Sequence, residues 1–194
     1  MVLHAPGRIV TANLALPADL AEVPHPEPAV SITREEIRPV SLLDGKAAKW
    51  LVYTHQWVPM SNNESYQRMD INPGPQSPPH WGVDIQFNDL GPGGRVPLHW
   101  TTSTGYLVVL QGTVHLICPA QAYNPTQGPG KMIEVACDPG DVVRQRGTLH
   151  ALENRGMETV GFMGIGIRAE PLLVGIEGQE QEAKRTIVDA WHNN

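Results

Sequence analysis

The sequence predicts an all-β fold, either a sandwich or a barrel of short strands. Its 194 residues include 19 glycines and 18 prolines, which are spread along the chain as turn signals between short apolar runs. Short strands broken at this spacing by glycine and proline are typical of sandwiches and barrels. The length fits one domain that buries a substantial core.

The individual strands are expected where apolar and polar residues alternate between turn signals. They are Arg8–Ala12, Ala29–Thr33, Trp50–Val58, Gly82–Leu90, Val96–Thr101, Tyr106–Gln111, Val114–Cys118, Lys131–Cys137, Asp141–Gln145, Ala151–Asn154 and Glu158–Arg168. In the strand at Trp50–Val58, alternation puts Leu51, Tyr53, His55 and Trp57 on one face. Residues 61–80 are rich in Asn, Ser, Pro and Gly, and are expected to form a long loop that could serve as a lid.

The chain is divided into three segments of a single domain. Residues 1–48 are interpreted as an N-terminal arm with edge strands, 49–170 as the barrel, and 171–194 as a helical tail. Within the tail, residues 178–191 are charged and helix-prone, with apolar side chains roughly on one side. We therefore expect one amphipathic helix that docks on the barrel.

Composition excludes several classes of partner. The formal net charge is -6 and no lysine or arginine cluster occurs, which argues against nucleic acid and anionic membranes. The apolar stretches are far too short to span a bilayer. The first residues show no apolar signal segment, so a cytoplasmic location is the default expectation. Cys118 and Cys137 are expected to be reduced thiols, because the predicted hairpin offsets them by several residues.

Three histidines fall in the central strands, at positions 99, 115 and 150. If the face with Val114 and Leu116 is the core face, alternation turns His115 outward. His99 lies one strand after the turn at Gly93, and His150 lies just after the turn at Gly147. These two histidines remain the candidate catalytic residues.

Two segments around these histidines carry a recognisable spacing. The first reads Gly93, five residues, His99-Trp100-Thr101, three residues, Gly105, six residues, Gly112. The second reads Pro139-Gly140-Asp141, then Gly147-Thr148-Leu149-His150, and Asn154. Both segments resemble the two motifs of the cupin superfamily.

The closest resemblance is to small one-domain cupins of fungal natural-product pathways. The matching residues are His99-Trp100-Thr101, the run from Gly105 to Val109, the run from Gly140 to His150, and the opening strand from Arg8 to Thr11. The resemblance covers about residues 8–168. It implies a double-stranded β-helix, or jelly-roll barrel, a homodimer paired through N-terminal strands, and a small polyketide-like substrate.

The chain departs from the cupin pattern at the metal ligands. Cupins normally supply three histidines and one glutamate. Here the second histidine is Thr101 and the glutamate is Gly105, so that only His99 and His150 remain. Threonine is a poor ligand and glycine offers no side chain, whereas a transition metal needs three or four protein donors. The expectation is therefore no cofactor, with low-affinity binding of a divalent metal left open.

Two inward histidines without a full metal shell suit proton transfer, because imidazole titrates near neutral pH. The leading hypothesis is a metal-independent lyase or isomerase with His99 and His150 as acid–base residues. Dehydration, decarboxylation, isomerisation and cyclisation all fit this chemistry. Candidate substrate-binding residues are Thr101 and Gln145 for orientation, Trp100 as a flat wall, Tyr53, His55 and Trp57 at the mouth or at an oligomer contact, and Asp84, a third acid or base if it faces inward.

Two other functions remain open. One is a metal-dependent oxygenase in which His99 and His150 bind the metal and water or substrate completes its shell. The other is a non-catalytic cupin that binds a small ligand.

Overall fold

The computed structural model describes residues 7–55, 82–124, 126, 128, 130–175, 184–187 and 190–192. The expected loop at 61–80, and Trp57 with it, lies outside these residues. The described part is built from strands, with two short 3-10 turns, η1 (Ala18–Leu20) and η2 (Leu43–Gly45). None of its helical segments is long and apolar enough to cross a membrane.

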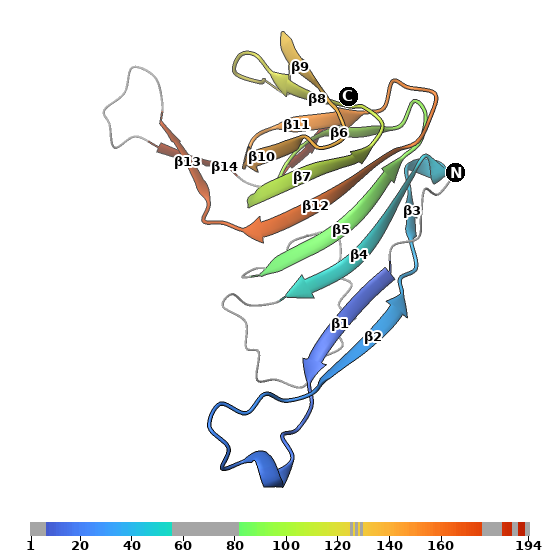
Figure 1. Ribbon diagram of the computed structural model, residues 1–194. Coiled ribbons are helices and arrows are strands. Elements are labelled where there is room, and N and C mark those ends of the chain that lie inside the picture. The colour runs from blue at the N-terminus through green and yellow to red at the C-terminus, as the bar shows by residue number, and fades with distance from the viewer. Residues whose placement is uncertain are drawn as a thin grey trace.

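Two sheets form the body of the molecule (Figure 1). In order across the first sheet, the strands are β10 (Val142–Arg146), β7 (Ser103–Gln111), β12 (Val160–Arg168), β5 (Val83–Leu90), β4 (Ala47–His55) and β3 (Val40–Leu42). Across the second sheet they are β15 (Ala190–His192), β6 (Arg95–Trp100), β11 (His150–Glu153), β8 (Val114–Pro119) and β9 (Met132–Cys137). Two separate hairpins join β1 (Gly7–Asn13) to β2 (Val30–Glu36) and β13 (Leu172–Gly175) to β14 (Lys184–Ile187).

The strand order is that of a jelly roll. The eight strands from β5 to β12 divide between the sheets as β10-β7-β12-β5 and β6-β11-β8-β9. Except for the hairpin of β8 and β9, strands that follow one another along this part of the chain lie in different sheets, and the first and last of the eight, β5 and β12, lie side by side. This order confirms the all-β prediction and the strands expected within residues 82–168.

The main core joins the two sheets. Buried residues of the first sheet pack with buried residues of the second; together they are Leu90, Leu107, Val109, Val160 and Phe162 with Val114, Cys137 and Leu152. Because residues paired directly across two antiparallel strands share a face, this cluster identifies the inward face of each strand.

Reading the register from that cluster gives the inward positions of the six-stranded sheet. One row across the sheet is Ala47, Leu90 and Val160, and the next is Lys49, Asn88, Phe162 and Val109. The third row is Leu51, Gln86, Gly164, Leu107 and Val143, and the fourth is Thr54, Asp84, Gly166, Gly105 and Gln145. The inward face thus changes along the strands from an apolar end to a polar end.

A β-bulge in β4 corrects the predicted faces of this strand. Leu51 pairs with Gln86, but the next pair is Tyr53 with Ile85, so that Val52 is an extra residue. The extra residue reverses the alternation, and Leu51 and Tyr53 lie on opposite faces. Sequence periodicity assumes an unbroken strand, which is why it placed them together.

The predicted C-terminal helix is wrong. In the described part of the tail, Lys184–Ile187 pairs with β13 and Ala190–His192 pairs with the edge of β6. A short helix is marginal by itself, whereas the pairing of Ala190–His192 satisfies backbone groups that the edge of β6 would otherwise leave open. Tertiary pairing therefore overrides the helical pattern of the side chains.

The thiols behave as the sequence predicts. Strands β8 and β9 form a hairpin in which Cys118 pairs with Ile133, while Cys137 pairs with Val114. Both cysteines are free.

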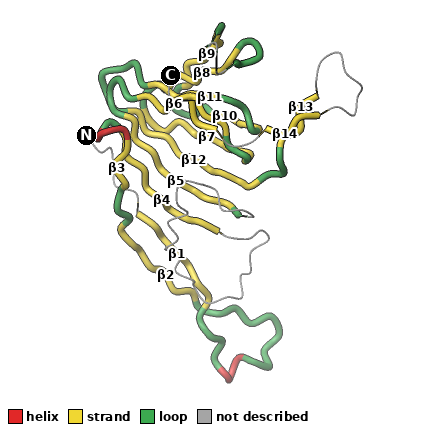
Figure 2. The backbone as a smooth tube through the Cα atoms, turned by 180° about the vertical axis from the view of Figure 1, so that it is seen from behind, coloured by secondary structure: helices red, strands yellow, loops and turns green. Residues whose placement is uncertain are grey.

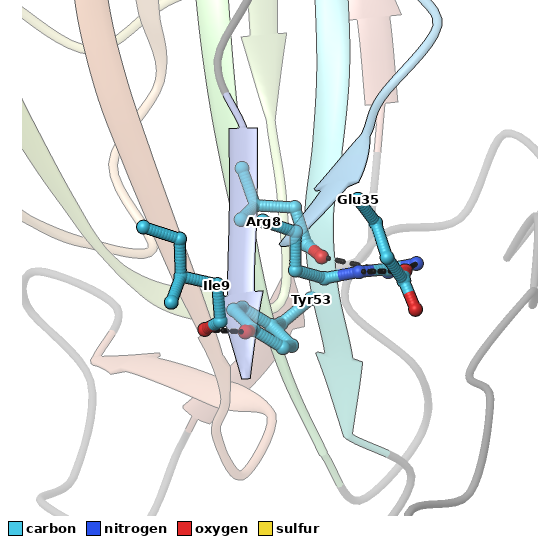
Figure 3. A network of polar contacts seen from close by, with 5 residues as sticks. Arg8, Ile9, Glu35 and Tyr53 are labelled. Carbon is cyan, nitrogen blue, oxygen red and sulfur yellow. Dashed lines mark hydrogen bonds and ion pairs between the residues drawn. The ribbon is translucent and has the colours of Figure 1, made fainter. Parts of the chain in front are cut away.

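The N-terminal hairpin docks on β4 through Arg8 (Figure 3). The guanidinium of Arg8 forms an ion pair with Glu35 and donates a hydrogen bond of 3.1 Å to the carbonyl oxygen of Val52. It also lies 5.7 Å from the ring centroid of Tyr53, whose hydroxyl donates to the carbonyl of Ile9 at 2.9 Å. These contacts cover the part of β4 that extends beyond its pairing with β3.

The other face of the hairpin is exposed and carries apolar side chains among polar ones. Ile9, Val30 and Ile32 have exposed fractions of 55%, 54% and 70%. Beyond the strands, residues 14–29 project away from the sheets (Figure 2). Pairing of two copies through N-terminal strands, which the resemblance implies, stays a prediction.

Replacing the docking arginine should loosen the hairpin. Arg8→Met removes the ion pair to Glu35 and the bond to Val52, and we expect the free energy of unfolding to fall by about 1 to 2 kcal/mol. Arg34→Met, on the exposed face of the same hairpin, is the matched control and should change little. Urea denaturation and hydrogen exchange over β1 and β2 measure both effects, and equal effects of the two variants would contradict the docking role.

Candidate functional site

Neighbouring strands of the second sheet bring His99 and His150 together. His150 pairs directly with His99, so the two side chains lie on the same face of the sheet. The next pair is Leu152 with Val96, and the register shift between the two pairs puts His99 and Val96 on that face although they are three residues apart. His150 shares its face with Leu152 of the core, so both imidazoles belong to the inward side. Their ring centroids are 4.3 Å apart at an interplanar angle of 54°.

Each imidazole is anchored in the same way. Nδ1 of His99 bonds to the carbonyl oxygen of Pro97 at 2.8 Å, and Nδ1 of His150 bonds to that of Thr148 at 2.8 Å. Because a carbonyl oxygen only accepts, each Nδ1 carries a proton, which leaves the lone pair of a neutral ring on Nε2. The site therefore presents two imidazoles whose Nε2 atoms can accept a proton.

Burial keeps both rings neutral. His150 is only 6% exposed, and desolvation together with the neighbouring His99 lowers its pKa to about 4. Desolvation also lowers the pKa of His99, partly opposed by its bond to Pro97. At neutral pH the pair consists of two bases, so a proton donor must come from elsewhere or from a base that has just been protonated.

The C-terminal strand adds an aromatic partner that the sequence did not reveal. Trp191 of β15 pairs with His99, and the two rings stack with centroids 4.3 Å apart and an interplanar angle of 9°. The indole thus covers one face of the His99 ring and fixes its orientation. Trp191 is itself 57% exposed.

Asp84 is the acid on the opposite sheet. It lies on the inward face of β5 and is 2% exposed, and burial raises the pKa of its carboxyl to about 6. The charge of Lys49, and hydrogen bonds from the backbone of Asp84 and Gly166, oppose part of that rise. Desolvation lowers the pKa of Lys49 in turn, while Asp84 raises it. Oδ2 of Asp84 has no hydrogen-bond partner in the described structure.

Gln145 lies in the same row as Asp84, three strands away. It pairs with Gly105, and its Nε2 is a buried donor without a partner in the described part of the chain. Thr101 follows the end of β6, where its hydroxyl bonds to that of Ser103 at 3.0 Å. The Thr101 hydroxyl therefore has a partner nearby in the sequence, whereas the Nε2 donor of Gln145 has none in the described chain.

The remaining candidates lie away from this face. Trp100 follows His99 and points to the opposite side of the sheet, where its indole N–H donates to the carbonyl oxygen of Gly147. Tyr53 and His55 stack with centroids 5.9 Å apart on the outward face of β4, next to the N-terminal hairpin. Trp57 is outside the described residues. His115 shares its face with Glu153 and not with the core.

Other inward polar residues lie near Asp84. Thr54 is fully buried and its hydroxyl has no partner within the described chain, as is also true of Gln86 Oε1 and Asn88 Nδ2. Strand parity placed Gln86 on the face of Asp84, and the same parity could have placed Asn88 there. Lys49 and Thr54 could not be found in this way, because the bulge at Val52 changes the parity between them.

The donor set does not fit a cupin metal centre. Among the described residues, no group of three or more His, Cys, Asp or Glu side chains is placed to hold an ion. The two other positions of the family pattern are Thr101, bonded to Ser103, and Gly105, which has no side chain. Two imidazole donors are fewer than a transition-metal site requires.

Comparison with known proteins finds similarity only among solved structures. No family model and no curated protein matches the chain. A cupin-2 domain protein from Rhodospirillum rubrum, Rru_A2000, overlaps 70% of this chain and 74% of its own with a TM-score of 0.45 and 13% identity. An oxalate decarboxylase from Lactobacillus farciminis overlaps 68% of this chain at a TM-score of 0.44 and 17% identity. An oxalate oxidase overlaps 44% at a TM-score of 0.37 and 20% identity.

The overlap with these proteins is partial. The chain spans 42% of the oxalate oxidase and 31% of the oxalate decarboxylase. With TM-scores below 0.5, the assignment of the fold comes from the strand order of the chain itself.

The buried His150 should make stability depend on pH. Its pKa is about 4 in the folded state and near 6.5 in the unfolded state, so the unfolded state binds more protons between these values. We expect His150 to lower the free energy of unfolding by about 3 kcal/mol in total as the pH falls from about 6.5 to about 4.

Urea denaturation across this range measures the effect against two variants. His150→Gln should show a smaller acid loss than the wild type, whereas His115→Gln, on the outward face, should not. Equal slopes for wild type and His150→Gln would contradict the burial of a neutral imidazole at this position.

Proposed function

We propose that the chain is a cupin that acts as a metal-independent lyase or isomerase on a small oxygenated, polyketide-like intermediate. The observation that carries the proposal is the pair of imidazoles anchored through Nδ1, which leaves the Nε2 lone pairs to accept a proton, at 4.3 Å between ring centroids. The substrate class comes from the resemblance to pathway cupins.

Proton transfer by these residues can be written for a dehydration. Nε2 of one histidine accepts the proton from a carbon next to a carbonyl group. The electron pair of the broken C–H bond forms a C=C bond, and the C–O bond to the neighbouring hydroxyl breaks. The departing oxygen takes a proton and leaves as water.

Two groups can supply that last proton. One is the imidazolium that has just formed, which then acts as the acid. The other is Asp84, whose carboxyl stays protonated up to about pH 6. Neither route needs an oxidant, a reductant or a metal ion.

A metal-dependent oxygenase is the second candidate. Metal-binding imidazoles are also oriented by a hydrogen bond from one ring N–H to a backbone carbonyl oxygen. His99 and His150 both have this arrangement through Nδ1. The short donor set disfavours it, and no step of the reaction above passes through a metal.

A non-catalytic ligand-binding cupin is the third candidate. Substitution of the two histidines separates it from an enzyme, because a binding protein has affinity to lose but no turnover.

The dehydration of a flat β-hydroxy ketone tests the proposal. A suitable probe is 3-hydroxy-1-tetralone, which loses water to give fluorescent 1-naphthol. His99→Gln and His150→Gln should each lower kcat by about 100-fold or more, because each removes a proton-transfer group. His115→Gln should retain the wild-type rate.

The pH profile of kcat/KM supplies a second readout. The rate should fall below about pH 4, where His150 becomes protonated. It should also fall above about pH 6 if Asp84 supplies the last proton, because its carboxyl ionises there, and should show no such fall if the imidazolium supplies it. Unchanged rates in both histidine variants, or activity that a chelator abolishes, would contradict proton transfer by this pair.

A further inference from the structure

Gly105 is not required by the fold. Its backbone does not adopt a positive φ, unlike seven other glycines in the described chain. A Cβ built at this position would meet Gln145 Oε1 at 3.4 Å, Gln145 Cβ at 3.8 Å and the carbonyl oxygen of Ile165 at 3.9 Å, all ordinary contacts. Glycine inside a strand loses more conformational entropy on folding than alanine does, so that it destabilises the strand.

A glycine inside a strand marks a bulge, a tight bend, or the close approach of a ligand or another backbone, and no bulge occurs at Gly105. Gly105 pairs on one side with Gln145 and on the other with Gly166. Gly166 pairs in turn with Asp84. Two positions without side chains therefore lie between two polar side chains, in one row on the inward face.

The polar groups at the two ends of this row lack partners of their own. Gln145 offers a buried Nε2 donor, and Asp84 offers a buried Oδ2 acceptor. Thr54, the next residue of the row after Asp84, adds a fully buried hydroxyl. None of these atoms has a hydrogen-bond partner in the described structure, and a buried polar atom without one is costly.

The row sets the length of its ligand. From Gln145 on β10 to Asp84 on β5 there are three strand intervals. At about 4.8 Å each, the Cα atoms lie roughly 14 Å apart along the sheet. Part of this distance is filled by the two side chains and their hydrogen bonds, which leaves room for a flat molecule of two fused rings.

We infer that the row from Gln145 to Asp84 is a binding floor for a planar bicyclic molecule with a carbonyl group at one end and a hydroxyl group at the other. The ring plane lies over Gly105 and Gly166, next to the Gln145 side chain that packs against Gly105. The carbonyl oxygen accepts from Gln145 Nε2, and the hydroxyl donates to Asp84 Oδ2. The inference names the substrate class of the proposed lyase or isomerase, on which it rests for its chemistry.

Binding of 7-hydroxycoumarin tests the inference without any turnover. This fluorescent molecule is flat and bicyclic, and it carries a lactone carbonyl and a phenol at opposite ends. Titrations at a pH where the phenol is un-ionised should give saturable binding. Coumarin, which lacks the hydroxyl, should bind about tenfold more weakly, as the loss of one hydrogen bond to a buried carboxyl group predicts.

Substitutions of the row locate the binding site. Gly105→Val should weaken binding of 7-hydroxycoumarin about tenfold or more, and Gly105→Ala should have a smaller effect in the same direction. Asp84→Ala should remove the preference for 7-hydroxycoumarin over coumarin. The control is Gly175→Ala on β13, where a Cβ would meet nothing within 4 Å, and its affinity should match the wild type.

The outcomes separate this inference from the proposed function. His99→Gln and His150→Gln should lose turnover but still bind 7-hydroxycoumarin in preference to coumarin, because that preference depends on Asp84. If no enzymatic activity is found but the Gly105 and Asp84 variants change the affinity as expected, the binding site is confirmed and the proposed lyase or isomerase activity is contradicted. The inference is overturned if Gly105→Val, shown to be folded by thermal unfolding, binds 7-hydroxycoumarin as tightly as wild type, or if the wild type does not bind it at all.

Discussion

The antiparallel register of the six-stranded sheet decides which side chains face the second sheet, and the rest of the site depends on it. Pairing places Gln145, Gly105, Gly166 and Asp84 in one row, although they come from four strands far apart in the sequence. The same register places the apolar residues of the core two to six residues away from the polar row along each strand. A slip by one residue would turn the polar row outward and expose the core, so the fold and the site are specified together.

The site joins acidic and basic groups whose pKa values burial changes in opposite directions. Burial lowers the pKa of His99 and His150 on one sheet, and it raises the pKa of Asp84 on the other. Each change favours the neutral form, because charge is costly away from water. The consequence is two bases and one carboxylic acid, all uncharged in mildly acidic solution. Such a set can transfer protons, and it offers a metal ion no negatively charged ligand while Asp84 is protonated.

Much of the fold could be predicted from the sequence, because strand parity and turn residues are local signals. The resemblance of the two motifs to cupins implied that His99 and His150 face one cavity, and the register shows that they pair directly. Local signals could not show the bulge at Val52, which reverses the faces of β4, or the strand at Ala190–His192, which brings Trp191 onto His99. Both depend on contacts between distant segments. The sequence presents Gly105 only as a missing ligand, whereas the register shows what the absence of a side chain leaves room for.

The metal content of the purified protein tests the central claim most directly. Elemental analysis after incubation with ferrous, manganese, nickel and zinc salts, followed by dialysis, measures what His99 and His150 retain. A site of two imidazoles predicts far less than one metal ion per chain with every salt. One ion per chain that survives dialysis, and that is lost in His99→Gln and His150→Gln, would contradict the account. The two histidines would then be metal ligands, and their Nε2 atoms would not be available to accept protons.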